Sequence, residues 1–522
     1  MWALQIDKIK SKFSNNFFYQ NITCLILGSL SSFSFSGNTI YLPLIFLAIN
    51  IFFYFTSLSF CNLYNSFKLS FAYSFGQLFF GIYWISIAFE TGKMAGIYIG
   101  LLAVLLLCVF LAFFMAFSIT LAKYLSTKWN LNSMGYAIIF SVFYSLSEYI
   151  RGNIFGGFPW NTIGYIWSDS YILLQPVALL GIYGFGLLSI LAILSFSLFF
   201  KNKLYAFYAL LPLIILFSYS IIKYEHNYLD EEKIALRLVQ PNIKQEEKWE
   251  SNLKEKHFKK LVNLSTYYKN SFKPKYIVWP ESAFEFNSKI IQQKNIHLFD
   301  WLEQDQLLIT GVTREDTNSK IQSEIYNSAF IINNKAEVIN HYDKVKLVPF
   351  GEFIPLRKYF SFEKFTIGSI DFSPGLKSNI IEIEKNSIKI GMLICYEIIF
   401  PGKVINGARP DFLINITNDA WYRDSIGPVQ HLSAARVRAI EEGITIIRVA
   451  NTGISTVIDP AGKYLNKLLL EEEGIIDITS IKKSDQTLFS IYGNFIYIIL
   501  CIFMLLLSRF VFKNVNYNFK ET

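Results

Sequence analysis

The segment Gly391-Met-Leu-Ile-Cys-Tyr-Glu397 ends a strand-like apolar run with a thiol, followed two residues later by a carboxylate. Two other strand-like runs in the same half of the chain also end in ionisable side chains. Glu281 follows Tyr276–Trp279, and two lysines and a glutamate lie along Tyr342-Asp-Lys-Val-Lys-Leu-Val-Pro-Phe-Gly-Glu352. An α/β scaffold places its chemistry at the ends of its strands. These three segments therefore predict one site that combines carboxylates, a lysine and a thiol.

The surrounding sequence alternates strand-like and helix-like segments, which is typical of sheets covered by helices. Helical patterns fall near 251–271, 289–304 and 427–443. The strand candidates are Ile234–Val239, Tyr276–Trp279, Leu307–Thr313, Asn327–Ile332, Ile388–Ile394 and Asp411–Ile416. We therefore predict an α/β domain over residues 223–490.

The rest of the chain consists mainly of long apolar runs. Of the 522 residues, 52% are hydrophobic and only 17% are charged, whereas a soluble protein carries about 25% charged residues. Runs of roughly 20 apolar residues can span a bilayer. Eight such runs are predicted as transmembrane helices, near 17–36, 39–60, 69–90, 95–121, 134–150, 171–200, 204–222 and 491–512. Residues 1–222 then form a membrane domain with seven helices, and 491–522 hold the eighth helix and a tail.

The net charge of +8 lies entirely outside the predicted α/β domain. Between Lys223 and Gln486 there are 35 basic and 35 acidic residues, and the remainder holds 13 basic and 5 acidic ones. The excess is spread over loops and does not form the basic cluster that nucleic-acid binding needs. Lys and Arg favour cytoplasmic loops, and a cytoplasmic N-terminus places eleven of these residues inside and two outside. This orientation predicts cytoplasmic termini and an α/β domain on the external face.

Cys395 is the single cysteine of the α/β domain, because Cys24, Cys61, Cys108 and Cys501 lie in or beside apolar runs. A lone thiol in a disulfide-permissive compartment has no partner within its own domain. Thiolate chemistry needs a base for the proton and a cation or N–H donor for an oxyanion. A glutamate and a lysine at neighbouring strand ends can supply both. The sequence holds no Gly-rich phosphate loop and no zinc-ligand spacing, so we expect neither cofactor nor metal.

These segments resemble the nitrilase (carbon–nitrogen hydrolase) superfamily, whose catalytic set is Glu, Lys and Cys on an αββα sandwich. Within it, nearly the whole chain is similar to the bacterial apolipoprotein N-acyltransferase family. The motifs that carry the resemblance are Glu148-Tyr-Ile-Arg-Gly, Gly157-Phe-Pro-Trp-Asn161, Val239-Gln-Pro-Asn242, Lys248-Trp249, Leu347-Val-Pro-Phe-Gly-Glu352, Thr417-Asn-Asp-Ala-Trp421, Ser425-Ile-Gly-Pro428 and Gln430-His431.

The resemblance implies a role for each matching residue. Glu281 is the general base, Lys344 the oxyanion-stabilising cation and Cys395 the nucleophile. Lys344 is preferred over Lys346 because the family's lysine stands eight residues before the glutamate of the Pro-Phe-Gly-Glu motif, here Glu352. Glu352 is an auxiliary acid that orients Lys344 or assists proton transfer. The remaining matches around the pocket are Trp249, Tyr396 and Glu397, and a purely structural role for Trp249 remains open.

The implied activity is transfer of an acyl chain from a membrane phospholipid, through a Cys thioester, to the N-terminal amine of a diacylglyceryl-cysteine on an apolipoprotein. The enzyme is then a monomer in the bacterial inner membrane with its catalytic domain on the periplasmic face. A membrane-tethered amidase of the nitrilase type is the main alternative, but one helix would suffice as its tether. A transporter places ionisable residues inside its spans, where Glu148 is nearly alone, and a catalytically inactive scaffold need not keep the catalytic set.

Overall fold

The computed structural model describes residues 16–58, 61–92, 96–226, 230–248, 250–267, 272–283, 298–316, 324–355, 371–376, 378–383 and 388–514. Trp249 lies outside these residues. The chain forms two compact units. The helical unit comprises residues 1–83, 102–225 and 491–522, and the α/β unit comprises residues 84–101 and 226–490.

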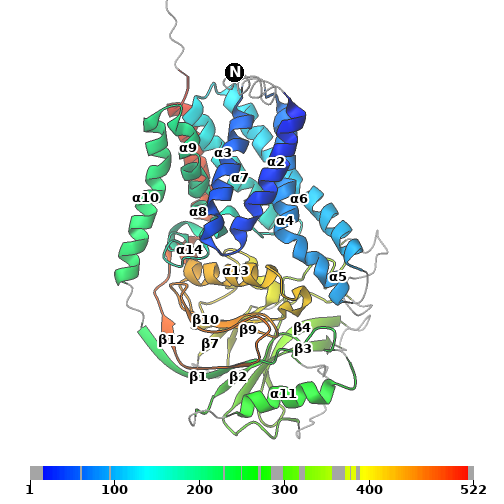
Figure 1. Cartoon of the computed structure of the whole chain (residues 1–522). Coiled ribbons are helices and arrows are strands. Elements are labelled where there is room, and N and C mark those ends of the chain that lie inside the picture. The colour runs from blue at the N-terminus through cyan, green and yellow to red at the C-terminus, as the bar shows by residue number, and fades with distance from the viewer. Residues whose placement is uncertain are drawn as a thin grey trace, which may run out of the picture. The chain divides into compact units, whose positions relative to one another are not determined.

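The helical unit is built from the predicted apolar runs (Figure 1). Its helices are α2 (Phe17–Ser31), α3 (Leu42–Ser57), α4 (Leu63–Ile82), α6 (Ile97–Lys128), α7 (Ser133–Asn153), α8 (Val177–Ile193), α9 (Ser195–Phe199), α10 (Lys203–His226) and α15 (Phe495–Val511). Among the described residues, five helical segments are long and apolar enough to cross a membrane, namely Thr39–Ser57, Leu63–Thr91, Ile97–Lys128, Val177–Phe199 and Lys203–Ile222.

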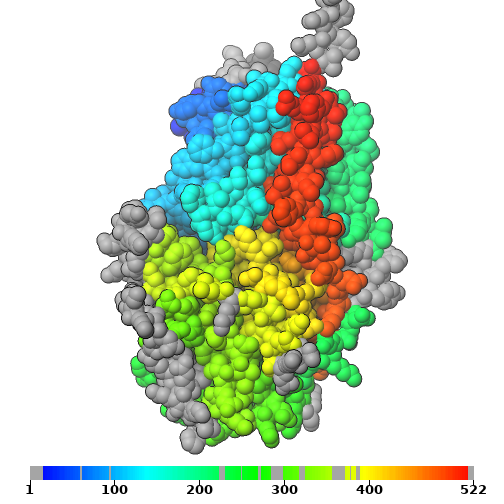
Figure 2. Space-filling model, turned by 180° about the vertical axis from the view of Figure 1, so that it is seen from behind, coloured from blue at the N-terminus to red at the C-terminus, as the bar shows by residue number. Residues whose placement is uncertain are grey.

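The prediction of eight crossings is thus supported for five segments and not as a count of eight. The other three runs also fold as helices, but α2 and α15 have only 15 and 17 residues. The third, α7, carries serines, Glu148 and Arg151 along its length. Its side chains are buried nearly all round, where it packs against α8 and α15. One face of α15 remains exposed at the surface (Figure 2).

Small residues allow the closest helix contact of this unit. A Cβ on Gly28 of α2 would lie 2.0 Å from the backbone oxygen of Tyr73, and one on Gly76 of α4 would lie 2.3 Å from that of Leu25. Glycine on both helices therefore lets the two backbones touch, as in other helix pairs of membrane proteins.

The α/β unit is a four-layered αββα sandwich, as predicted (Figure 1). One sheet has the order β12-β1-β2-β3-β4-β5 and the other β11-β10-β9-β8-β7-β6. Helix α11 (Lys254–Thr266) contacts β1 and β12 of the first sheet, and α13 (Gly427–Glu442) contacts β9 and β10 of the second. Apolar side chains of both sheets fill the space between them.

The strand bounds explain where the polar residues emerge. The strands are β1 (Asp230–Gln240), β2 (Tyr276–Val278), β3 (Leu307–Asp316), β4 (Glu324–Ile332), β5 (Val338–Asp343), β6 (Ile380–Glu382), β7 (Lys389–Ile394), β8 (Phe412–Thr417), β9 (Ile446–Ala450), β10 (Ser455–Ile458), β11 (Tyr464–Leu468) and β12 (Gly474–Lys483). In each sheet three consecutive strands run parallel: β1, β2 and β3, and β7, β8 and β9. Parallel strands deliver their carboxyl ends to one edge, so Glu281 after β2 and Cys395 after β7 stand at such edges.

Residues 84–92 belong to the α/β unit although they follow an apolar helix in the sequence. The Trp84 indole N–H donates to Gln430 Oε1 at 3.1 Å, and its ring meets Tyr422 edge-on at 4.5 Å. Arg423 bridges Glu90 at 3.0 Å and Glu246 at 2.9 Å. This segment therefore braces the loop after β8.

Candidate active site

Cys395 sits where β7 ends and a short 3-10 turn, η6 (Cys395–Ile399), begins. Its φ is +50°, the left-handed region that side chains other than glycine rarely adopt. Strain of this kind costs of order 1–3 kcal/mol and persists only where the surroundings enforce it. The sharp turn places the side chain beyond the strand end, partly exposed. Such placement is what an attacking nucleophile requires.

Lys344, Glu281 and Glu352 form one buried polar cluster. The Lys344 amino group lies 2.9 Å from Glu352 Oε1 and 3.5 Å from Glu281 Oε1. Asn327 of β4 donates to the same two oxygens, at 2.8 Å to Glu281 and 2.9 Å to Glu352. Burial lowers the pKa of Lys344, but the two carboxylates outweigh it and raise that pKa above its usual value. Lys344 is therefore a permanent cation in a buried setting, where a charge acts strongly on a developing oxyanion.

The charges of this cluster change the pKa of the Cys395 thiol. Burial and the negative charge of Glu281 raise the pKa of Cys395, while Lys344 lowers it by a smaller amount. The net pKa is above that of a free thiol, about 8.5. At neutral pH the sulfur is thus protonated, and attack on a carbonyl requires simultaneous removal of that proton. Glu281 is the carboxylate of the predicted set that acts on the thiol.

We expect Glu281→Gln to lower the pKa of Cys395 while it slows acyl transfer. The neutral amide removes the negative charge that disfavours the thiolate, so the thiol titrates at lower pH. Loss of a general base costs roughly 10²–10⁴ in rate. Thiolate absorbance at 240 nm, taken as the difference from the matching protein with Cys395→Ala, measures the first effect. Glu231→Gln, at an exposed glutamate of β1, should change neither quantity. A thiol titration that moves to higher pH would contradict the assignment.

Tyr396 and Glu397 follow the nucleophile in the 3-10 turn, and both are buried. The Tyr396 ring packs edge-on against Phe400 at 5.1 Å. Glu397 holds two segments together: its Oε1 accepts from the Tyr342 hydroxyl at 2.8 Å and from Val345 N–H at 2.8 Å, and its Oε2 accepts from Ile394 N–H at 2.8 Å. This carboxylate therefore ties the lysine segment to the strand that ends at Cys395.

Glu352 also anchors its own loop. Besides Lys344 and Asn327, it accepts the backbone N–H of Val348 at 2.7 Å through Oε2. The structure thus brings together Glu281, Lys344 and Glu352 by direct contacts. The side chain of Lys346 instead lies over the Phe400 ring, 5.6 Å from its centroid. This difference favours Lys344 as the functional lysine of the pair.

Three features of the site have no counterpart in the predicted residue set. Asn327, which donates to both carboxylates, is the first residue of the predicted strand Asn327–Ile332, and no motif singled it out. Lys248 is buried, donates to the backbone oxygen of Glu281 at 3.2 Å, and has its pKa lowered to about 8 by burial, against the opposing charges of Glu281 and Cys395. Its place in the Lys248-Trp249 motif was the only sequence feature that pointed to it.

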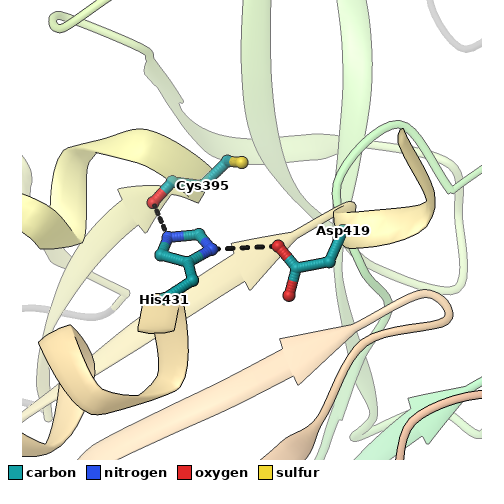
Figure 3. A group of neighbouring side chains, drawn as sticks. All are labelled: Cys395, Asp419 and His431. Carbon is teal, nitrogen blue, oxygen red and sulfur yellow. Dashed lines mark hydrogen bonds and ion pairs between the residues drawn. The ribbon is translucent and has the colours of Figure 1, made fainter. Parts of the chain in front are cut away.

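The third feature is the pair Asp419 and His431, which lies beside Cys395 (Figure 3). His431 of α13 lies 2.9 Å from Asp419 Oδ1 through Nδ1 and 3.2 Å from the Cys395 carbonyl oxygen through Nε2. Ligand atoms of these three residues lie within 4.8 Å of one another, as a metal site would require. However, Arg448 donates to Asp419 Oδ2 at 2.6 Å and lies 3.1 Å from His431 Nδ1. A guanidinium already supplies the positive charge here, so the donor set does not suit a metal ion.

Comparison with known proteins agrees with the division into two units. Residues 235–485 match the carbon-nitrogen hydrolase family model, and residues 27–194 match the model of the apolipoprotein N-acyltransferase N-terminal domain. The sandwich with its strand-end cysteine is therefore a carbon-nitrogen hydrolase domain.

Relatives that align over most of this chain show which family it belongs to. Proteins named apolipoprotein N-acyltransferase are 35% identical in Rickettsia typhi and 34% in Rickettsia prowazekii, each aligned over 93% of this chain and 97% of the relative. The protein of that name in Rickettsia bellii is 33% identical over 85% of this chain and 88% of its own length. The chain belongs to the apolipoprotein N-acyltransferase family.

Proposed function

We propose that this protein transfers an acyl chain from a membrane phospholipid to the N-terminal amine of a diacylglyceryl-cysteine on an apolipoprotein. The observation that carries the proposal is the buried Lys344 cation held between Glu281 and Glu352, with its charge acting on the Cys395 thiol. Together these groups offer a base, an oxyanion-stabilising charge and a nucleophile. The family relationship supplies the substrate class.

In the first half-reaction, Glu281 takes the proton of the Cys395 thiol as the sulfur attacks the ester carbonyl of the phospholipid. Lys344 stabilises the negative charge on the tetrahedral oxygen. The C–O bond to the glycerol then breaks, the leaving alkoxide takes the proton back from Glu281, and a lysophospholipid departs. The acyl group remains on Cys395 as a thioester.

In the second half-reaction, the α-amine of the acceptor attacks the thioester carbonyl. Lys344 again stabilises the oxyanion, and Glu281 accepts a proton from the attacking nitrogen. The C–S bond breaks, the sulfur recovers a proton, and an amide forms. Glu352 holds Lys344, and Asn327 links Glu352 to Glu281, so the three charged groups keep their relative positions throughout.

The proposed lipid substrates explain why the enzyme has apolar helices. An acyl chain gains about 0.8 kcal/mol per CH₂ in the bilayer, so the enzyme has to meet both substrates at the membrane. We propose eight crossings, with both termini in the cytoplasm and the α/β unit on the periplasmic face. The lysine distribution described above supports this orientation.

Topology can be tested by cysteine labelling in spheroplasts with a membrane-impermeant maleimide. Glu231→Cys, exposed on β1 of the α/β unit, should be labelled in intact spheroplasts. Lys128→Cys, exposed at the end of α6, should be labelled only after permeabilisation. The reverse pattern would place the α/β unit in the cytoplasm and overturn the orientation.

The activity itself is tested by incubating the purified full-length protein with a defined phospholipid and measuring its intact mass. We expect a gain of one acyl chain on Cys395 that hydroxylamine removes and that a diacylated lipopeptide takes up as an amide. A membrane-tethered amidase would instead release ammonia from small amides and gain no lipid acyl chain. Amide hydrolysis without acylation by phospholipid would therefore favour the alternative.

A further inference from the structure

The histidine next to the nucleophile contacts its backbone and not its sulfur. His431 Nε2 lies 3.2 Å from the carbonyl oxygen of Cys395, and the sulfur points away from the ring (Figure 3). Asn415 Nδ2 approaches the same oxygen at 3.5 Å, too long for a strong hydrogen bond. His431 is therefore the main group that holds the carbonyl of a residue whose φ of +50° needs outside support.

The ring can play this part in only one tautomer. A proton on Nδ1 alone would leave the Nε2 lone pair facing the carbonyl oxygen, which is also an acceptor. A proton on Nε2 donates to Cys395, and Nδ1 then accepts from Arg448 Nη2, 3.1 Å away. If both nitrogens are protonated, Nδ1 donates to Asp419 Oδ1 at 2.9 Å, and Nε2 still donates to Cys395. In the Nε2–H tautomer the unprotonated Nδ1 faces the Asp419 oxygen at 2.9 Å as well as Arg448, so only the doubly protonated ring donates to both oxygens. Both of these forms supply the Nε2–H donor to Cys395.

The neighbours fix the ring itself. Asp419 and Arg448 are completely buried and joined at 2.6 Å, and Arg448 also donates to Asn415 Oδ1 at 2.7 Å. Thr417 adds a donor to Asp419 at 3.3 Å. Burial and the Arg448 charge lower the pKa of His431, with Asp419 opposing them. The ring is therefore clamped from β8, η7 (Asp419–Tyr422) and β9, three elements that do not carry the nucleophile.

A hydrogen bond that fixes the Cys395 carbonyl also fixes the N–H of Tyr396, which belongs to the same peptide unit. The Cys395–Tyr396 peptide unit is planar, and in the trans form its C=O and N–H point in opposite directions. A hydrogen bond from His431 to the oxygen thus sets the direction of the Tyr396 N–H as well. It also fixes the backbone from which the Cys395 side chain leaves, and so the line of attack of the sulfur.

We propose that His431 is a positioning residue for acyl transfer. Through its Nε2–H bond to the Cys395 carbonyl, it fixes the Cys395–Tyr396 peptide unit so that the sulfur and the Tyr396 N–H face the reacting carbonyl together with Lys344. The inference rests on the proposed function, in that it takes Cys395 as the acylated residue. It assigns the Gln430-His431 motif to the geometry of the nucleophile and not to proton transfer.

Two substitutions that differ by one methylene group test this assignment. The side-chain amide nitrogen of glutamine reaches the place of Nε2, whereas that of asparagine reaches only the place of Nδ1. We expect His431→Asn to slow single-turnover acylation of Cys395 by phospholipid about 10²–10³-fold, the loss typical of one oxyanion donor. His431→Gln should stay within about tenfold of the wild type, as rescue by a retained donor requires. The apparent KM for phospholipid should change little in both.

Alkylation of Cys395 by iodoacetamide is the readout that separates positioning from a general structural defect. It needs the thiolate but no oxyanion stabilisation, so its pH profile should be the same in His431→Asn and the wild type. His257→Gln, at a buried histidine of α11, is the matched control and should leave acylation and alkylation unchanged. Equal acylation rates in the Asn and Gln variants would overturn the proposal, and so would an alkylation rate that falls in step with acylation.

Running the same pair with a soluble p-nitrophenyl ester keeps this test independent of the lipid substrate. If the wild-type protein takes no acyl chain from phospholipid but is acylated by the ester, only the proposal that phospholipid is the acyl donor is contradicted. The contrast between His431→Asn and His431→Gln would then still decide the role of His431.

Discussion

Replacing Cys395 with alanine should abolish acyl transfer and leave no covalent acyl-enzyme. The sulfur is the atom that carries the acyl group between the two lipid substrates, and the methyl group of alanine cannot take its place. Loss of a nucleophile in an acyl-transfer site costs on the order of 10⁶ in rate. Intact-mass measurement after incubation with phospholipid, together with an N-acylation assay on a diacylated lipopeptide, gives the result directly.

The control for this change is a cysteine of the helical unit. Cys501→Ala removes a thiol from α15 and leaves Cys395 in place, so its acyl-enzyme should accumulate as in the wild type. Acylation that persists in Cys395→Ala would show that another residue is the nucleophile. Folding of the alanine variant is checked by its melting temperature, which should stay near that of the wild type because the side chain is small and partly exposed.

Lys344→Met should reduce the rate of acyl transfer at least 10²–10³-fold, the cost of one oxyanion-stabilising group. A second effect adds to the first, because the substitution leaves Glu281 and Glu352 buried without their shared cation. Two uncompensated carboxylates favour protonation of one of them, and a protonated Glu281 cannot take the thiol proton. The measurement is the rate of thioester formation as a function of phospholipid concentration. The loss should appear in kcat and not in KM.

Lys346→Met provides the matched comparison two residues along the chain. The Lys346 amino group lies over the Phe400 ring. Its backbone N–H, which the substitution leaves in place, donates to Glu397 Oε1 at 3.1 Å. Its variant should therefore retain most of the activity. If Lys346→Met lost as much activity as Lys344→Met, the choice between the two lysines would be wrong.

The sequence predicted those residues of the site that lie just after the end of a strand or in a recognisable motif. Glu281 and Cys395 each follow an apolar strand within a few residues, and Lys344 is eight residues from Glu352 in a recognisable motif. Local sequence carries that information, because the residue after a strand has to leave the sheet. The alternation of strands and helices and the helical nature of the apolar runs followed from periodicity, whereas the two-sheet sandwich was implied by the family resemblance.

The part that could not be predicted is the set of contacts between distant segments. Asn327 joins Glu281 and Glu352 from a strand between them, and the Glu397 carboxylate accepts from Tyr342 and three backbone N–H groups. The eight-crossing count also remained unsupported for three helices. Length and hydropathy do not separate a membrane span from a helix buried among others, as Val177–Phe199 illustrates: it is long and apolar enough to cross a membrane, yet 89% of its apolar stretch is buried.

The sequence by itself determined the two kinds of structure in this chain, its family and the identities of the nucleophile, base and cation candidates. These properties depend on local periodicity, on motifs and on the charges of short loops. Only the tertiary structure decided how the candidates act on one another: that Lys344 lies between two carboxylates, and that His431 holds the Cys395 carbonyl. A hydrogen bond needs its two atoms about 3 Å apart, and only the folded chain brings β4, η7, α13 and β9 to those distances.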